Sequence, residues 1–386
     1  MTGLSIVGIG STTFARHEGR TAVSLAAEAG IQALRESGLD AEHIGALYLG
    51  NFISGFLTGQ EVLAGLTADR MSLGAIPATK VEGACASGGI AFRHACMAVA
   101  SGQCEAAIAI GVEKMSHAGT ATVTQGLNCA LDHEADAASG LTYPGLFALV
   151  WQAHAARYGT TREEVSAVVK KNRRNGLANP LASMGANLSD SDIEGAPVIA
   201  DPLTLYDCCP ISDGAAAVIV TRDDLARQSS ATAIRVRASA QTSGRPGLAA
   251  HPDLCGFAAT SAAAHRAFAD ARLAPADIDL IELHDCFSIA EIVDIEDLGF
   301  MPKGHGGAWA REGRTAVGGD LPVNPSGGLE AKGHPVGATG IGQIYEVVCQ
   351  LRGDHANQVE GARLGLTHNL GGTGVACTVN ILERTS

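Results

Sequence analysis

Two glycine-rich stretches, residues 83–89 and 333–340, each stand where a predicted helix begins. The first is followed by a predicted strand at 106–111, and the second by a predicted strand at 364–367. A turn of small residues that opens a helix, followed by an apolar strand, therefore occurs in both halves of the chain. Because such internal similarity is typical of repeated structural units, the chain is predicted to be a duplicated α/β unit.

Alternating strands and helices also surround these stretches. The apolar segments are short and bounded by turn residues, as in the buried strands of α/β sheets. Predicted strands cover 4–8, 44–50, 215–220, 278–283 and 376–382, and an amphipathic helix covers 22–37. Strand-like runs are missing from about 117 to 200, where predicted helices at 145–158 and 162–175 dominate. We therefore expect a first half at 1–117, an inserted helical loop domain at 118–200, a return to the first half at 201–235 and a second half at 236–386.

Composition limits the classes of function. Of 386 residues, 46% are hydrophobic and 17% are charged, against about 25% charged residues in typical soluble domains, so extensive burial and a subunit interface are expected. The formal net charge is −13, so the chain lacks the excess of basic residues that binds nucleic acid or an anionic membrane. Neither is an expected partner. No apolar run approaches the roughly 18 residues of a membrane span, and no signal peptide is evident. Ten cysteines without a C-x-x-C pair indicate free thiols and a cytoplasmic location.

Motifs for metals and nucleotides are missing from the sequence. No G-x-x-x-x-G-K-[ST] phosphate loop occurs, and the adjacent pair Cys208 and Cys209 is a poor geometry for two ligands of one zinc ion. Neither a metal nor a bound cofactor is therefore expected.

Cys85 is the first candidate catalytic residue. It lies at a predicted strand-to-helix junction and is flanked by Gly83, Ala84, Ala86 and Gly88. A cysteine at a helix N-terminus lies at the positive end of the helix dipole, which favours the thiolate and lowers the thiol pKa. Small neighbours leave room for an extended thioester substrate. A buried structural cysteine is the alternative, and residue spacing alone leaves the two interpretations evenly matched.

His334 favours the catalytic interpretation. Gly333, His334 and Pro335 precede the matching helix of the second half. Two equivalent helix N-termini that meet at the pseudo-twofold axis would bring a thiol and an imidazole together, which is the basic unit of thiol nucleophilic catalysis. The alternative is a histidine that merely caps the helix.

A third candidate segment, His284-Asp285-Cys286-Phe287, follows an apolar strand, where functional groups of α/β sheets commonly emerge. Here a second thiol beside a histidine could exchange protons with a substrate. The alternative is that Cys286 fills the core.

Together these residues resemble the thiolase superfamily over almost the whole chain. Cys85 in its Gly-Ala-Cys-Ala-Ser-Gly-Gly stretch is similar to the nucleophile motif, and Gly333-His334-Pro335 is similar to the motif of the activating histidine. The His-Asp-Cys-Phe segment resembles the sterol-carrier-protein-type branch, here without the carrier domain. One departure is Asn369, which stands where classical thiolases carry a second catalytic cysteine; in the resembled branch the cysteine of His-Asp-Cys-Phe takes over that role, and Cys286 matches it.

The resemblance implies α-β-α-β-α layers, with the helical loop domain over the active site. It further implies that Cys85, activated by His334, attacks an acyl-CoA thioester and forms an acyl-cysteine intermediate. The backbone amides of Cys85 and Gly371 are the expected oxyanion hole. Cys286 is expected to move the α-carbon proton, and His284 and His334 to stabilise the enolate oxygen. The implied activity is that of an acyl-CoA thiolase, an acetyl-CoA C-acyltransferase that makes or cleaves a 3-oxoacyl-CoA in lipid metabolism by Claisen chemistry.

Four basic residues and two rival functions complete the expectations. Lys170, Lys171, Arg173 and Arg174 are candidates for binding coenzyme A phosphates, although charged runs on helices are more often solvated surface. The first rival is a thiolase-like acyltransferase that acts on a non-CoA acceptor within a multi-subunit complex. The second is a non-catalytic scaffold subunit, which the intact catalytic residues disfavour. A homodimer or homotetramer is expected, and a small accessory subunit is a further candidate partner.

Overall fold

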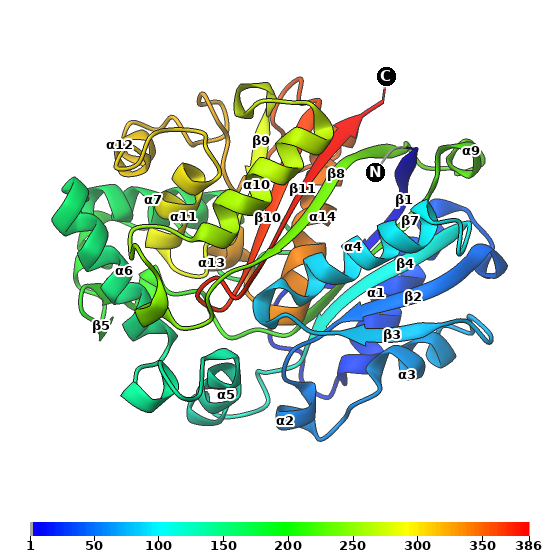
Figure 1. Ribbon diagram of the computed structural model, residues 1–386, viewed down its shortest axis with the longest axis horizontal. Coiled ribbons are helices and arrows are strands. Elements are labelled where there is room, and N and C mark those ends of the chain that lie inside the picture. The colour runs from blue at the N-terminus through cyan, green and yellow to red at the C-terminus, as the bar shows by residue number, and fades with distance from the viewer. Residues whose placement is uncertain (1–2, 386) are drawn as a thin grey trace.

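Nine strands form one mixed sheet in the computed structural model, which describes residues 3–385 (Figure 1). The strands are β1 (Leu4–Ser11), β2 (Ile44–Gly50), β3 (Ala78–Val81), β4 (Ala106–Glu113), β7 (Gly214–Arg222), β8 (Ile234–Ser243), β9 (Leu280–Glu282), β10 (Leu364–Gly371) and β11 (Ala376–Arg384). Their order in the sheet is β3-β2-β4-β7-β1-β8-β11-β10-β9.

The two halves of this sheet have the same pairing pattern. β2 runs parallel to β4, and β4 and β1 are both antiparallel to β7. In the second half β9 runs parallel to β10, and β10 and β8 are both antiparallel to β11. The halves meet where β1 pairs with β8 at Ser5–Arg235 and Ile6–Ile234. The predicted duplication is confirmed, and the two half-sheets are continuous at this junction.

Helices cover the outer faces of both half-sheets and also lie between them. α1 (Ala22–Ser37) packs on β1 and β7, and α10 (Ala258–Ala271) packs on β8 and β11. α4 (Ser87–Ala100) and α14 (Val336–Arg352) pack against each other in the middle layer, where their apolar side chains share one buried cluster with both half-sheets (Figure 1). This arrangement matches the expected layers.

The middle helices approach closely because glycines stand at their crossing. A Cβ atom on Gly340 of α14 would lie 2.3 Å from the backbone nitrogen of Gly89 in α4. A Cβ atom on Gly88 would lie 2.9 Å from the carbonyl oxygen of Gly337. Real side chains do not fit at such distances, so the glycines of both motifs are needed to bring the two helix starts together.

Residues 118–200 hold mainly helices, and the two long ones pack on the second half. They are α5 (Thr120–Leu127), α6 (Tyr143–Tyr158), α7 (Arg162–Gly176) and α8 (Asp190–Glu194), followed by the short pair β5 (Val198–Ala200) and β6 (Leu203–Thr204). α7 packs against α11 (Ser288–Asp297), α12 (Gly306–Arg311) and α13 (Gly328–Lys332). In Figure 1 α6, α7, α11 and α12 gather around the end of the second half-sheet, whereas α5 lies beside the first half. The remaining short helices are α2 (Ser54–Thr58), α3 (Leu63–Arg70) and α9 (Asp223–Ala226).

Several boundaries differ from the expectations. The predicted strand at 364–367 continues to Gly371 in β10, because His368 and Asn369 are polar but fully enclosed between sheet and helices. β8 and α10 were not among the predicted elements. Within residues 3–385, no helix combines the length and hydropathy that a bilayer crossing requires.

The helix crossing generates a stability prediction. Gly340→Ala should lower the free energy of unfolding by about 1–3 kcal/mol, as overpacking of a filled core does. Gly65→Ala is the matched control, since Gly65 lies inside α3 with nothing within 4 Å of its Cβ position. That change should be stabilising by about 0.5–1 kcal/mol through helix propensity. The urea unfolding midpoints of the two variants measure these changes. An unchanged midpoint in Gly340→Ala would contradict the close packing at the crossing.

Candidate active site

Cys85 lies in a strained turn between β3 and α4. Residues Ala84–Ala86 form a 3-10 turn, and Ala84 has φ 51°, a left-handed conformation that costs energy for a residue with a Cβ. The Ser87 hydroxyl holds the turn, because it accepts a hydrogen bond from the Gly83 N–H at 3.0 Å and donates one to the Ala84 carbonyl at 2.6 Å. The turn places the Cys85 side chain at the start of α4, as predicted.

His334 lies between α13 and α14 and has a defined tautomer. Its Nδ1 is 2.6 Å from Oγ1 of Thr339, whose hydroxyl donates to the Pro335 carbonyl at 3.3 Å. Since that hydroxyl proton is used, Thr339 accepts from Nδ1–H of His334. The opposite atom, Nε2, is buried and has no hydrogen-bond partner among the described residues. His334 is therefore arranged as a proton acceptor at Nε2.

His284 follows β9 and has the opposite arrangement. The side-chain amide of Asn369 donates to Nδ1 of His284 at 3.1 Å, which leaves the ring proton on Nε2. The amide oxygen of Asn369 accepts from the Gly89 N–H at 3.4 Å, and this contact fixes which end of the amide faces the histidine. His284 is therefore a donor at Nε2. Asn369 was noticed in the sequence only as a missing cysteine, and its orienting contact was not predicted.

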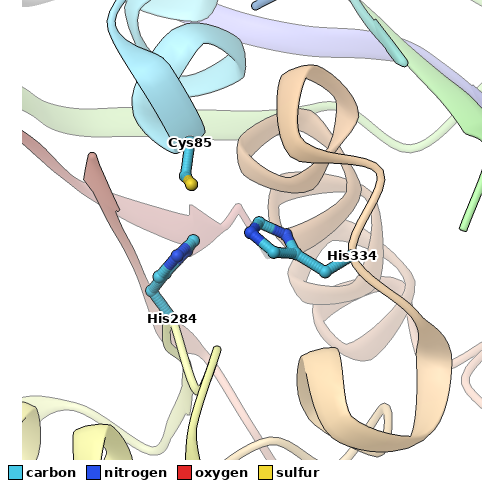
Figure 2. Close-up of side chains that lie close together, drawn as sticks. All are labelled: Cys85, His284 and His334. Carbon is cyan, nitrogen blue, oxygen red and sulfur yellow. The ribbon is translucent and has the colours of Figure 1, made fainter. Parts of the chain in front are cut away.

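The structure brings Cys85, His284 and His334 together (Figure 2). The sulfur and the nearest ring nitrogens all lie within 4.8 Å of one another. The two imidazole rings are 4.9 Å apart between centroids and nearly perpendicular, at 81°. In Figure 2 the three side chains come from the turn before α4, the loop after β9 and the segment before α14, and they point toward one common space.

A largely apolar cavity of about 80 Å³ surrounds this space. Cys286, predicted as the second thiol, also lines it. The other residues that line it include aromatic side chains and one more thiol, none of them predicted: Phe52, Tyr143, Phe147, Cys209 and Phe287.

Burial keeps these groups neutral. It raises the pKa of the Cys85 thiol to about 12, an effect that hydrogen bonds from the backbone N–H groups of Gly372 and of Cys85 itself partly offset. Burial lowers the pKa of His334 to about 3, and burial together with the neighbouring His334 lowers the pKa of His284 well below its usual value. The prediction that the helix dipole gives Cys85 a low pKa is wrong, because desolvation of the charged sulfur outweighs the dipole. The resting site holds a thiol and a neutral imidazole.

The thiol of Cys286 is also neutral. Burial, with Cys209 and Cys85 nearby, raises its pKa well above the usual value. Cys209 has the same tendency, and its backbone N–H donates to the Cys286 carbonyl at 3.1 Å. At rest Cys286 therefore carries a proton that it can donate.

The backbone N–H that faces the Cys85 sulfur is that of Gly372, one residue after the predicted Gly371. Gly371, predicted to join Cys85 in the oxyanion hole, ends β10 and pairs with Ala376 of β11, with its Cα against the carbonyl of Gly83. The following residue, Gly372, turns out of the strand with φ 57° and directs its N–H to the Cys85 sulfur.

None of the four predicted coenzyme A contacts lines the cavity. For Lys171 and Arg173 the prediction is wrong, because each is 4% exposed and already paired. Lys171 forms an ion pair with Glu291 at 3.0 Å, and Arg173 donates to the Met184 carbonyl at 3.1 Å.

The other two candidate coenzyme A contacts on α7 are accessible. Lys170 forms an ion pair with Asp190, and Arg174 is exposed. Between them, buried Asn172 donates to Asp285, the residue between His284 and Cys286, at 3.0 Å. The buried face of α7 therefore supports the catalytic loop, and phosphate binding by Lys170 and Arg174 stays a prediction.

Thiol and imidazole groups this close are also ligands that zinc prefers. The contacts of Thr339 and Asn369 involve only the Nδ1 atoms of the two histidines. The expectation that the chemistry needs no metal stays a prediction.

Comparisons with known proteins agree with this geometry. The family model described as thiolase, N-terminal domain, matches residues 4–224, and thiolase C-terminal domain-like matches residues 240–384. The chain is 45% identical to an acetyl-CoA acetyltransferase of Methanothermobacter thermautotrophicus, over all of both chains. It is 32% identical to sterol carrier protein 2 of Oryctolagus cuniculus, over 96% of this chain and 70% of that protein. The solved structure of an Ltp2-ChsH2(DUF35) aldolase superposes with a TM-score of 0.83 at 25% identity, over 99% of this chain and 98% of that chain.

The raised pKa of Cys85 generates a pH prediction. Iodoacetamide alkylates the thiolate, so the alkylation rate of Cys85 should rise about tenfold per pH unit from pH 7 to pH 10, all of it below the pKa of about 12. Mass mapping of the Cys85 peptide gives the rate. A free cysteine derivative, whose pKa is about 8.5, should level off over the same range. A rate for Cys85 that is already constant at pH 7 would mean a resting thiolate and would contradict the neutral pair.

Proposed function

The chain belongs to the thiolase superfamily, and we propose that it makes or cleaves a short 3-oxoacyl-CoA through an acyl group carried on Cys85. It is an acyl-CoA thiolase, an acyltransferase that takes coenzyme A thioesters as substrates. The observation that carries the proposal is the meeting of Cys85, His284 and His334 within 4.8 Å, with Nε2 of His334 bare and Nε2 of His284 protonated.

The acyl group that the site accepts is small. The cavity of about 80 Å³ beside Cys85 is lined by bulky apolar side chains such as Phe52 and Phe147, which suits a short acyl chain. The name of the acetyl-CoA acetyltransferase relative points the same way. We therefore propose acetyl transfer, with acetoacetyl-CoA as the 3-oxoacyl thioester.

The first half of thiolysis starts from the neutral thiols of Cys85 and Cys286 and the neutral imidazoles of His334 and His284. Cys85 attacks the C3 ketone of the 3-oxoacyl-CoA while its proton passes to Nε2 of His334. The backbone N–H groups of Cys85 and Gly372 stabilise the oxygen that becomes negative. When the C2–C3 bond breaks, its electron pair forms the enolate of the leaving acetyl-CoA. Nε2–H of His284 stabilises that enolate oxygen, and the neutral thiol of Cys286 protonates C2.

The second half restores both protons. Coenzyme A enters as a thiol and gives its proton to the Cys286 thiolate. Its sulfur attacks the acyl group on Cys85, the Cys85 sulfur leaves, and the imidazolium of His334 returns the first proton to it. The products are acetyl-CoA and a shortened acyl-CoA, and every group ends in its starting state.

Two variants separate the thiols. Cys286→Ala should lower thiolysis of acetoacetyl-CoA by about 10²–10⁴-fold, the usual contribution of a general acid. It should keep the exchange of labelled coenzyme A into acetyl-CoA, because no C–H bond forms in that exchange and the thiol proton can pass between Cys85 and coenzyme A through Nε2 of His334 alone. Cys85→Ala should abolish both reactions.

Cys209→Ala is the matched control, since Cys209 is a third thiol of the same cavity with no assigned step. It should retain near-normal thiolysis. Wild-type protein without any thiolysis would overturn the proposed function, and normal thiolysis by Cys286→Ala would overturn the assignment of the proton donor.

We also propose a homodimer. β3 is an edge strand of the sheet, and α3 packs beside it. The neighbouring apolar side chains of Phe56 and Val62 are 52% and 68% exposed. An unpaired strand edge next to exposed apolar side chains is a favourable surface for self-association.

The ten free cysteines support a cytoplasmic location, which cell fractionation would test.

Light scattering of the purified chain should give at least twice the chain mass of 39.3 kDa. The similar aldolase structure carries ChsH2 in its name as a second component beside Ltp2, which supports an accessory subunit here as well. An active monomer would contradict the dimer, and full thiolysis by the purified chain alone would contradict a required accessory subunit.

A further inference from the structure

Tyr143 carries the one hydroxyl group among the residues that line the cavity, and no catalytic step above uses it. Its hydroxyl oxygen is buried, and no group among the described residues forms a hydrogen bond with it. A buried hydroxyl without a partner is unfavourable, and native structures rarely keep one without a reason. Resting on the proposed function, we propose that the Tyr143 hydroxyl is a third donor to the substrate oxygen that becomes negative when Cys85 attacks.

The position of the hydroxyl supports this assignment. Tyr143 lines the cavity together with Cys85 and Cys286. A Cβ atom on Gly372 would lie 3.3 Å from the Tyr143 hydroxyl, so the phenol stands directly beside Gly372. The N–H of Gly372 points to the Cys85 sulfur. Since the attacked carbonyl carbon is bonded to that sulfur, its oxygen forms next to the phenol.

The helix that carries Tyr143 packs on the catalytic loop. Tyr143 is the first residue of α6, and Phe147 lies one turn later on the same helix. Phe147 stacks on Phe287 at 4.6 Å between centroids and 28° between planes. Phe287 follows Cys286 directly, so α6 and the catalytic loop are packed as one unit. The hydroxyl can therefore act as a preorganised donor rather than one that must be recruited.

The charge state of Tyr143 suits donation. Burial raises the pKa of its phenol above the usual value, and the nearby thiols of Cys85 and Cys286 raise it further. The hydroxyl keeps its proton throughout the working pH range. Its hydrogen bond strengthens as the substrate oxygen gains charge, which is the property that speeds the reaction rather than binding alone.

Tyr143→Phe tests the proposal because it removes the hydroxyl and keeps the ring. The change should lower kcat by about 10²-fold, as loss of one oxyanion donor does. The loss should occur in thiolysis of acetoacetyl-CoA and also in the exchange of labelled coenzyme A into acetyl-CoA, because both pass through the same oxyanion on Cys85. The KM for coenzyme A and the urea midpoint should stay unchanged.

Tyr48→Phe is the matched control, since Tyr48 lies in β2 against His94 and outside the cavity. It should leave both reactions unchanged. Normal kcat in Tyr143→Phe overturns the inference, and so does a loss confined to thiolysis, because the hydroxyl would then act on the enolate. Wild-type protein that performs neither reaction overturns the proposed function instead, so the two failures are distinguishable.

Discussion

The close crossing of α4 and α14 is the constraint on which the rest of the site depends. Each helix carries one catalytic group just before its first turn, and the groups meet because Gly89 and Gly340 let the two backbones touch. A Cβ atom at this crossing would push the helix starts apart and separate the sulfur of Cys85 from Nε2 of His334. The glycines therefore serve the chemistry through packing, and the duplicated fold supplies the two helix starts that such a crossing requires.

Desolvation follows from the same packing and determines how the site can react. The middle layer leaves little water around the catalytic atoms, so each group is neutral at rest. A neutral thiol needs a base within reach, and His334 provides one because Thr339 occupies its other nitrogen. The hydrogen bonds at the two Nδ1 atoms thus decide which histidine accepts a proton at Nε2 and which one donates there.

Sequence reasoning identified the residues whose position depends on local backbone and missed those that depend on packing between segments. Cys85 and His334 could be predicted because a glycine-rich turn before a helix is visible in the residues themselves. The burial of Lys171 could not be predicted, because contacts with α11, α12 and α13 decide which face of α7 is buried. The expectation of a low pKa for Cys85 was wrong for the same reason, since the helix dipole is a local property and the depth of burial is not. Tyr143 lies about sixty residues from Cys85 in sequence, and no pattern in the chain connects them.

Asn369 shows how the site accommodates the loss of a second cysteine at this position. Its amide bridges α4, through the Gly89 N–H, and the loop after β9, through Nδ1 of His284. A cysteine side chain there could carry a proton, but it is too short to bridge both partners and would leave the tautomer of His284 undetermined. In the proposed mechanism, proton transfer belongs to Cys286, two residues beyond the histidine that the amide orients. The two positions then act as one unit: the loop carries the thiol, and the amide of Asn369 fixes the loop's histidine.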